Sequence, residues 1–298
     1  MNHLISAKEL LTVVVETLHC NVSTQSPPTR IFDCRHRLND PAAGHRLYLT
    51  GHIPGAVHVH LDRDLSDMNQ IEGRDVAVQR LYDTDHPHPG RHPLPSGPEI
   101  LKRFGHWGVT PETDVVVYDD MGGAMAARLW WMLRAVGHGR VRVLNGGFPA
   151  WTGDKETVEH PLVVSNGAYP GHFRSELLVD FSEVLKTERE FILLDARAAD
   201  RFRGEHEPLD PPGGHIPGAI NTPFQDQLNA DGTFKDPATL QALYIGSGAD
   251  RLVASCGSGV TACHLILGLA IAGREDDVQL FPPSFSGWSR TAGLPIEK

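Results

Sequence analysis

The chain has 298 residues, of which 40% are hydrophobic and 21% are charged, a composition typical of globular proteins. This length favours two domains, because one domain usually spans about 150 residues. The formal net charge of -10 argues against a broad nucleic-acid surface, which needs clustered Lys and Arg. The four cysteines form no CxxC pair, so we expect neither a disulfide framework nor a zinc site, and a reducing compartment fits best.

Residues 1–18 predict an amphipathic helix, because their apolar side chains recur at helical spacing. One face carries Leu10, Leu11, Val14, Val15 and Leu18. The segment lacks the long apolar core and the cleavage site of a signal peptide. No stretch approaches the ~20 uninterrupted apolar residues of a membrane-spanning helix. We therefore expect a soluble, cytoplasmic protein without membrane or nucleic-acid partners.

The chain then repeats a set of motifs. Gly-His-Ile-Pro-Gly-Ala occurs at 51–56 and at 214–219, and an apolar run ending in Asp-x-Arg precedes each copy, at 31–35 and 193–197. A second apolar run and its glycine-rich turn pair Asp120 in the first copy with Cys256 in the second. A repeat of this length indicates a duplicated domain and not a solenoid.

Short β-branched runs alternate with helical stretches in both copies, which predicts an α/β fold. We expect two tandem domains, each a mostly parallel sheet flanked by helices on both faces. The first spans 1–152 and has Asp120 at the cysteine position, a linker covers 153–174, and the second spans 175–298. The first copy also contains an insertion at 61–98, and loops of such length are usually functional or disordered.

Cys256 is the most informative residue of the second copy. It follows the apolar residues 252–254 and precedes a glycine-punctuated turn and an apolar run at 262–272. At the carboxyl end of a strand, backbone N–H groups and the positive end of a helix dipole stabilise a thiolate and bind anions. These residues predict a cysteine nucleophile for an anionic substrate. A buried, unreactive cysteine is the alternative interpretation.

Taken together, these motifs resemble the tandem-domain rhodanese family, the thiosulfate and 3-mercaptopyruvate sulfurtransferases. The resemblance implies a catalytic second domain, a catalytically silent first domain and an active site between the two. Cys256 matches the nucleophile that carries sulfur as a persulfide. Gly257, Gly259, Val260 and Thr261 match the loop whose N–H groups face that sulfur.

Four further residues gain expected roles through this resemblance. Arg201 matches an arginine that binds the carboxylate or sulfonate of the sulfur donor, with Arg203 as the alternative contact. Asp62 and His92, both in the insertion, match positions that form a proton relay with Ser258 in mercaptopyruvate enzymes.

The sequence departs from the mercaptopyruvate branch of the family at two places. Leu209 stands where a second arginine is common, and a missing guanidinium removes a bidentate clamp for a carboxylate. Residues 284–289 differ from the usual last loop of the catalytic domain. Both departures affect which donor we expect. They do not change the sulfur transfer that we expect at Cys256.

The implied function is transfer of sulfane sulfur from 3-mercaptopyruvate to cyanide, a small thiol or a thioredoxin-like protein. The alternatives are thiosulfate as the donor, a cysteine-loop phosphatase or arsenate reductase, and a non-enzymatic sulfur carrier. A phosphatase is disfavoured because the loop from Cys256 to Thr261 is one residue short and has no arginine. We expect no cofactor, and the histidines at 86, 88 and 92 lack the ligand spacing of a recognised metal site.

Overall fold

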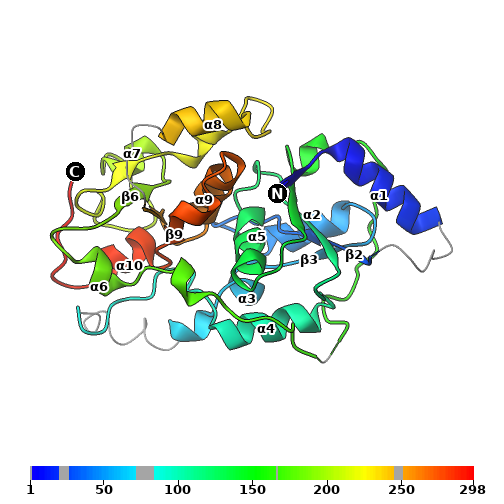
Figure 1. Cartoon of the computed structure of the whole chain (residues 1–298), viewed down its shortest axis with the longest axis horizontal. Coiled ribbons are helices and arrows are strands. Elements are labelled where there is room, and N and C mark those ends of the chain that lie inside the picture. Colours follow the sequence, from blue (N-terminus) through cyan, green and yellow to red (C-terminus); the bar gives the residue numbers. More distant parts are fainter. Residues whose placement is uncertain (1, 20–26, 72–83, 166, 245–250) are drawn as a thin grey trace. The chain divides into compact units, whose positions relative to one another are not determined.

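The computed structural model describes residues 2–19, 27–71, 84–165, 167–244 and 251–298 (Figure 1). The chain divides into two compact units. The first comprises Met1–Leu65, Pro95–Arg174 and Asn229–Phe234, and the second comprises Ser66–Leu94, Ser175–Leu228 and Lys235–Lys298. Within the described ranges, no helix is both long enough and apolar enough to cross a membrane.

The first unit is built on a five-stranded sheet in the order β1-β5-β4-β2-β3. Its strands are β1 Leu4–Ile5, β2 Thr29–Asp33, β3 Ala56–His58, β4 Asp114–Tyr118 and β5 Val141–Leu144. Every neighbouring pair is parallel, so the strands all end at the same edge of the sheet. At that edge Asp33 lies opposite Tyr118.

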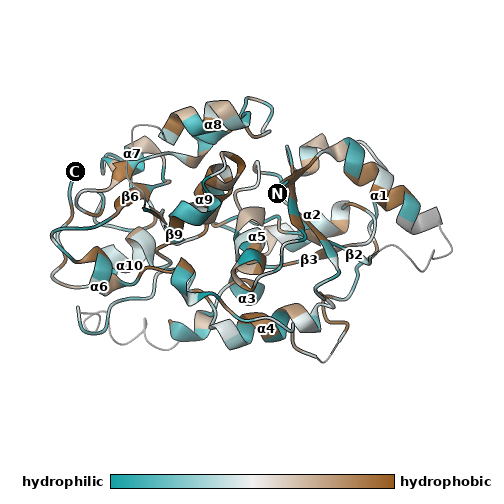
Figure 2. Cartoon of the chain, viewed as in Figure 1, coloured by the Kyte–Doolittle hydropathy of each residue, from teal (hydrophilic) through white to brown (hydrophobic). Residues whose placement is uncertain are grey.

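Five helices of the described residues accompany this sheet, and a sequence motif marks where the first of them begins. The helices are α1 Ala7–His19, α2 Ala43–Thr50, α3 Leu61–Asp64, α4 Gly97–His106 and α5 Ala126–Ala135, with a 3₁₀ turn at Phe148–Ala150. Ser6 and Glu9 form a capping box, each side chain accepting the other's backbone N–H. The helix predicted for residues 1–18 is present as α1, but it begins only at Ala7, because Leu4 and Ile5 form strand β1. Brown and teal alternate along α1 in Figure 2. Its buried face is narrower than predicted, because Leu10 and Val14 are buried whereas Val15 is 44% exposed.

The second unit is built on a four-stranded parallel sheet in the order β7-β6-β8-β9. Its strands are β6 Ile192–Asp195, β7 Ile220–Asn221, β8 Leu252–Ser255 and β9 Val278–Leu280. Its helices are α6 Phe181–Val184, α7 Ala199–Phe202, α8 Pro237–Tyr244, α9 Thr261–Ile271 and α10 Ser284–Arg290, and its 3₁₀ turns are Met68–Gln70, Ser175–Leu177, Phe224–Gln227 and Glu275–Asp277. In Figure 1, α8 and α9 lie on one side of this sheet, and α6 and α10 lie on the other. The predicted α/β architecture of two parallel sheets flanked by helices is therefore confirmed.

The two units are not continuous along the chain. Much of the insertion, from Ser66 to Leu94, belongs to the second unit although it interrupts the first copy of the repeat. Its described part is tied to α10, because the N–H of His88 donates to Thr291 Oγ1 over 3.0 Å and the N–H of Arg91 donates to Ser286 Oγ over 2.9 Å. The predicted domain boundaries at 152 and 175 stay predictions.

The Asp-x-Arg motif has the same structural task in both copies. Arg35 pairs with Asp33, and Arg197 pairs with Asp195, with all four side chains buried. The guanidinium of Arg35 also donates to the carbonyl of Gly51 over 2.8 Å, and that of Arg197 donates to the carbonyl of Gly214 over 2.9 Å. Each arginine thus fastens its strand to the Gly-His-Ile-Pro-Gly-Ala turn that follows.

The sheet register corrects one expectation, because Asp119 and not Asp120 is the counterpart of Cys256. Tyr118 pairs with Asp33 just as Ser255 pairs with Asp195. The backbone carbonyl of the residue that follows, Asp119 or Cys256, accepts an equivalent hydrogen bond in each copy. The N–H of Phe148 donates to Asp119 O over 2.7 Å, and the N–H of Phe285 donates to Cys256 O over 3.0 Å. Two adjacent aspartates follow the strand, and an apolar pattern alone does not show at which residue the strand ends.

Candidate functional site

Cys256 lies between the end of β8 and the start of α9, as the sequence predicts. Its side chain is only 1% exposed. The N–H of Gly259 points at its sulfur, with 3.2 Å between the nitrogen and Sγ. The N–H of Cys256 itself donates to Ser284 Oγ over 3.1 Å. The sulfur of Cys256 therefore accepts a hydrogen bond from the backbone of its own loop.

The loop after Cys256 is clamped against α10. The carbonyl of Gly257 accepts the N–H of Ser286 over 2.7 Å. Gly259 has a φ of 76°, and a Cβ at this position would stand 2.4 Å from the carbonyl oxygen of Pro282. Ser284, which receives the N–H of Cys256, has the unusual φ of 52°. Strained backbone of this kind gathers where a site must be held in one geometry.

The remaining predicted loop residues complete the turn into the helix. Val260 is 3% exposed and precedes α9, and Thr261 is the first residue of that helix. This brings the amino-terminal turn of an eleven-residue helix to the cysteine, where the positive end of the helix dipole favours negative charge.

In the equivalent loop of the first unit, the backbone N–H groups bind a carboxylate. The fully buried carboxylate of Asp119 accepts four backbone N–H bonds of 2.7–2.9 Å, from Met121, Gly123, Met125 and Ala126. Burial raises the pKa of Asp119, and these four N–H groups partly offset that effect. In the first unit the turn between strand and helix therefore presents four N–H groups to one central acceptor, and in the equivalent turn of the second unit the N–H of Gly259 points at the sulfur of Cys256.

Ser258 and His92 are brought together although 166 positions separate them in the chain. The Oγ of Ser258 and the Nδ1 of His92 are 2.7 Å apart. Both side chains are buried, with exposed fractions of 5% and 6%. Because hydroxyl and imidazole groups both donate and accept protons, this pair can carry a proton beside the cysteine loop.

The third expected member of the relay, Asp62, belongs to the first unit. It lies in α3, and its backbone N–H donates to Nδ1 of His60 over 3.2 Å. A role for Asp62 beside Ser258 and His92 stays a prediction.

Arg201 lies on α7 and is held by two acidic side chains. Its guanidinium makes a forked contact with Glu207, at 2.7 and 3.1 Å, and reaches Asp210 at 3.4 Å. The alternative arginine, Arg203, instead pairs with Glu205, and both of these side chains are more than half exposed. Of Arg201 and Arg203, it is therefore Arg201 that contacts buried carboxylates.

Sequence reasoning missed two arginines in this place. Arg91, from the insertion, and Arg290, from the end of α10, both contact the carboxylate of Asp210, at 2.8 and 2.6 Å. Asp210 is fully buried. Burial alone raises its pKa, but the hydrogen bonds and charges of Arg91 and Arg290 outweigh burial and hold the pKa of Asp210 below its usual range. The segments lie far apart in sequence, and the only hint was the position of Arg91 next to His92.

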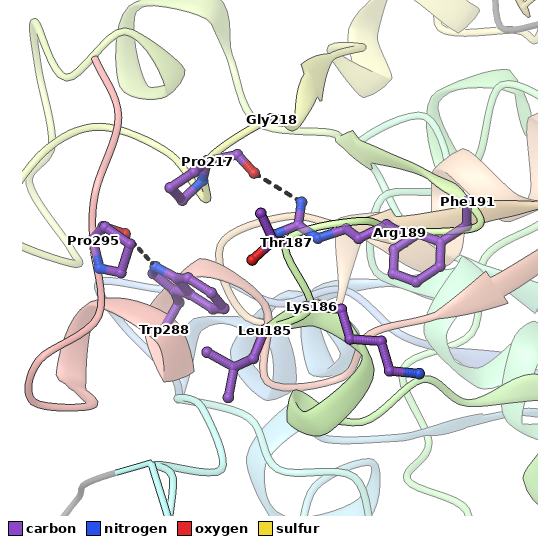
Figure 3. Close-up of a pocket in the computed structure, with 9 residues that line it drawn as sticks. All are labelled: Leu185, Lys186, Thr187, Arg189, Phe191, Pro217, Gly218, Trp288 and Pro295. Carbon is purple, nitrogen blue, oxygen red and sulfur yellow. Dashed lines mark hydrogen bonds between the residues drawn. The ribbon is translucent and has the colours of Figure 1, made fainter.

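A pocket of about 510 Å³ lies elsewhere in the second unit (Figure 3). Two of its polar wall groups are occupied by the fold: Arg189 donates to the carbonyls of Val184 and Pro217, and the indole N–H of Trp288 donates to Pro295 O. None of the predicted site residues lines it. We therefore do not take this pocket as the reactive site.

One described group has the residue types of a metal site. In the first unit, the ligand atoms of His52, Glu156 and His160 lie within 4.8 Å of one another. The His–Glu part of this group recurs in the second unit, where His215 and Glu297 are 3.7 Å apart compared with 3.8 Å for His52 and Glu156. Since both copies repeat this contact, we interpret it as a feature of the fold.

Comparison with known proteins places the site in a family context. The family model described as "Rhodanese-like domain" matches residues 17–154 and again 180–291. A probable 3-mercaptopyruvate sulfurtransferase of Pseudomonas aeruginosa is 39% identical over 98% of both chains. A Mycobacterium tuberculosis protein, described provisionally as a thiosulfate sulfurtransferase, is 40% identical over 90% of both chains. Among solved structures, an Escherichia coli protein described with the 3-mercaptopyruvate sulfotransferases superposes with a TM-score of 0.74 at 29% identity, covering 96% of this chain and all of that one.

Proposed function

Because the chain belongs to the rhodanese-like domain family and is a sulfurtransferase, we propose that it takes sulfane sulfur from 3-mercaptopyruvate onto Cys256. The sulfur then passes to cyanide, a small thiol or a thioredoxin-like dithiol. Every sulfurtransferase needs a sulfur donor and a sulfur acceptor. The identity of the donor and the roles of individual residues are the proposal.

The proposed reaction has two half-reactions. The thiolate of Cys256 attacks the donor's sulfur, an S–S bond forms, and the C–S bond breaks with its electron pair going to the enolate of pyruvate. The proton of the donor's thiol balances the proton that the enolate takes up. An acceptor thiolate or cyanide then attacks the outer sulfur, and Cys256 leaves as a thiolate, which is covalent catalysis with ping-pong kinetics.

The hydrogen-bonded pair of Ser258 and His92 supports mercaptopyruvate as the donor. An enolate must be protonated as it leaves, whereas sulfite leaves thiosulfate with no proton transfer. A buried hydroxyl and imidazole 2.7 Å apart provide a route for that proton, and such general acid catalysis is worth about 10²–10⁴-fold in rate. With thiosulfate as the donor, Ser258 and His92 would have no proton to transfer.

Thiosulfate is the second candidate donor, for two reasons. Leu209 occupies the place of an expected guanidinium, and the Mycobacterium tuberculosis relative is described with thiosulfate. A sulfonate needs positive charge but no proton, so this donor depends on the arginines and not on Ser258.

The test is mass spectrometry of the protein after separate exposure to 3-mercaptopyruvate and to thiosulfate, together with steady-state kinetics for both. We expect a gain of one sulfur atom on Cys256 with 3-mercaptopyruvate and a higher kcat/KM for that donor. Cys256→Ser should gain no sulfur and lose transfer while unfolding at the same temperature. Transfer retained by Cys256→Ser contradicts the nucleophile, and a higher kcat/KM for thiosulfate contradicts the donor.

Ser258→Ala separates the two donors. Without the hydroxyl, turnover of 3-mercaptopyruvate should fall by at least about tenfold while turnover of thiosulfate changes little. Equal losses with both donors would show that Ser258 supports the loop and does not move a proton.

A further inference from the structure

Three arginines from separate segments converge on one buried carboxylate in the second unit. Arg91 comes from the insertion, Arg201 from α7 and Arg290 from the end of α10. All three contact Asp210, at 2.8, 3.4 and 2.6 Å respectively. We call these three side chains the arginine cluster.

The arginine cluster keeps a net positive charge. Its three guanidinium groups face two buried carboxylates, those of Asp210 and Glu207, whose exposed fractions are 0% and 2%. Glu207 is shared further, because it also contacts Arg197 at 3.2 Å. The carboxylates therefore hold the guanidinium groups in place without neutralising them. A second anion can still be bound.

Two members of the cluster face the residue next to Cys256. Around the point where Gly257 would carry a Cβ, the nearest atom is Arg91 Nη2 at 3.3 Å, followed by Arg201 Nη2 and the carboxylate oxygen Asp210 Oδ2, both at 3.5 Å. The side chains of Arg91 and Arg201 are 21% and 20% exposed. Among the described residues, the Nη1 atoms of both have no hydrogen-bond partner. These guanidinium groups thus keep donors available to a ligand beside the cysteine loop.

Arg290 is differently placed within the cluster. Its Nη1 donates to Asp210 and to the carbonyl of Ser286, and its Nη2 donates to the carbonyl of Leu209. With both terminal nitrogens occupied, Arg290 serves to fix Asp210 and the backbone at Leu209. It is a positioning residue.

We propose that Arg91 and Arg201 together bind the anionic end of the sulfur donor, and that Arg91 supplies the guanidinium that Leu209 lacks. This inference rests on the proposed function and names the donor-binding residues of that same site. A planar carboxylate accepts parallel N–H bonds from such groups, which a lysine ammonium cannot imitate. Asp210 and Arg290 position the pair.

The experiment compares Arg91→Gln with the wild-type protein, using 3-mercaptopyruvate and its neutral analogue mercaptoacetone, which lacks the carboxylate. We expect kcat/KM for 3-mercaptopyruvate to fall about 10- to 100-fold, the effect of one lost charge-assisted contact. The loss should lie mainly in KM. Turnover of mercaptoacetone and transfer of sulfur from preloaded protein to cyanide should be unchanged, because neither step involves the carboxylate.

Two further variants make the result interpretable. Arg203→Gln removes an arginine that is 53% exposed and paired with Glu205, so its kinetics should match the wild type. Arg91→Lys keeps the charge beside Asp210 but loses the forked contact, and should fold normally with an intermediate loss. If Arg91→Gln is unstable, Arg91→Lys carries the test.

The outcomes separate this inference from the proposed function. Wild-type protein that takes no sulfur from 3-mercaptopyruvate overturns the donor assignment, and the same variants are then measured with thiosulfate, whose sulfonate should show the same loss. Wild-type protein that works normally together with an unchanged Arg91→Gln variant overturns the inference alone. Equal losses with charged and neutral donors overturn it as well, because they indicate a structural role.

Discussion

At the scale of single residues, the two units place different groups in the same turn. Asp119 in the first unit and Cys256 in the second follow the last residue of equivalent strands. A carboxylate cannot carry sulfane sulfur, whereas a thiolate can be converted to a persulfide. The first turn therefore keeps the anion-binding geometry without the chemistry.

Asp210 is the residue whose charge matters most to the arginine cluster. Asp210→Asn leaves three guanidinium groups without their shared carboxylate, and we expect a loss of about 2–4 kcal/mol in the free energy of unfolding at neutral pH, allowing for the partial exposure of the arginines. Since the folded state lowers the pKa of Asp210 below the ordinary 3.8, its charge stabilises the protein above that value. This contribution disappears as the pH falls further, through the pKa of the folded state.

Urea unfolding over a pH series measures this effect. The difference between the wild type and Asp210→Asn should be full at neutral pH and should shrink below 3.8. Glu205→Gln, which removes a partner of Arg203 that is more than half exposed, should leave stability unchanged at each pH. A difference that persists undiminished in acid would contradict this account of Asp210.

At the scale of elements, the site depends on how α10 holds the turn between β8 and α9. Backbone bonds from Phe285 and Ser286 fix the carbonyls of Cys256 and Gly257, and the insertion binds α10 through Thr291 and Ser286. One short helix thus joins the cysteine loop to the segment that carries Arg91 and His92.

Gly259→Ala tests the fit of this turn. A side chain at a φ of 76° costs about 1–2 kcal/mol, and the new Cβ would also stand 2.4 Å from the backbone oxygen of Pro282. We expect lower stability and at least a tenfold (about 1.4 kcal/mol) slower formation of the persulfide, measured by denaturation and by rapid-quench mass spectrometry.

The matched control is Gly232→Ala, because Gly232 has a φ of 79° but no atom within 4 Å of the new Cβ. It should show the backbone strain alone, with normal persulfide formation. Similar behaviour of the two variants would mean that contact with Pro282 is unimportant.

Local signals explain why the turn between strand and helix at Cys256 could be predicted from sequence. Cys256 stands between an apolar strand pattern and a helical one, and the nearby glycine has the positive φ that such a turn requires. The counterpart of Cys256 was misplaced by one residue, because both Asp119 and Asp120 follow the strand and only the register distinguishes them. Arg91 and Arg290 could not be predicted, since their meeting at Asp210 depends on tertiary structure and no local pattern encodes it.

At the scale of the whole molecule, the chain exchanges segments between its two units. Residues 66–94 leave the first copy to join the second unit, and Asn229–Phe234 leave the second copy to join the first. Each unit nevertheless has its own buried core, one around Val116 and Leu144 and another around Leu193 and Val253.

Hydrogen exchange in a matched pair of core variants tests this division. Leu193→Ala and Leu144→Ala each remove a side chain that is at most 2% exposed, in different units, and each should cost about 2–5 kcal/mol. The amides of Gly90 and Arg91, although carried by the insertion in the first copy, should exchange faster in Leu193→Ala only. Faster exchange of these amides in Leu144→Ala alone would place the insertion with the first unit.

The position of the insertion limits how this gene can be rearranged. Arg91 and His92 are encoded in the first half of the chain, whereas Cys256 and Ser258 are encoded in the second. A recombination break in the segment between the repeats would yield a second half that keeps the proposed nucleophile but lacks the proposed proton carrier and half of the proposed anion clamp. The duplicated halves are therefore not interchangeable modules, because the second unit includes residues 66–94 from within the first copy.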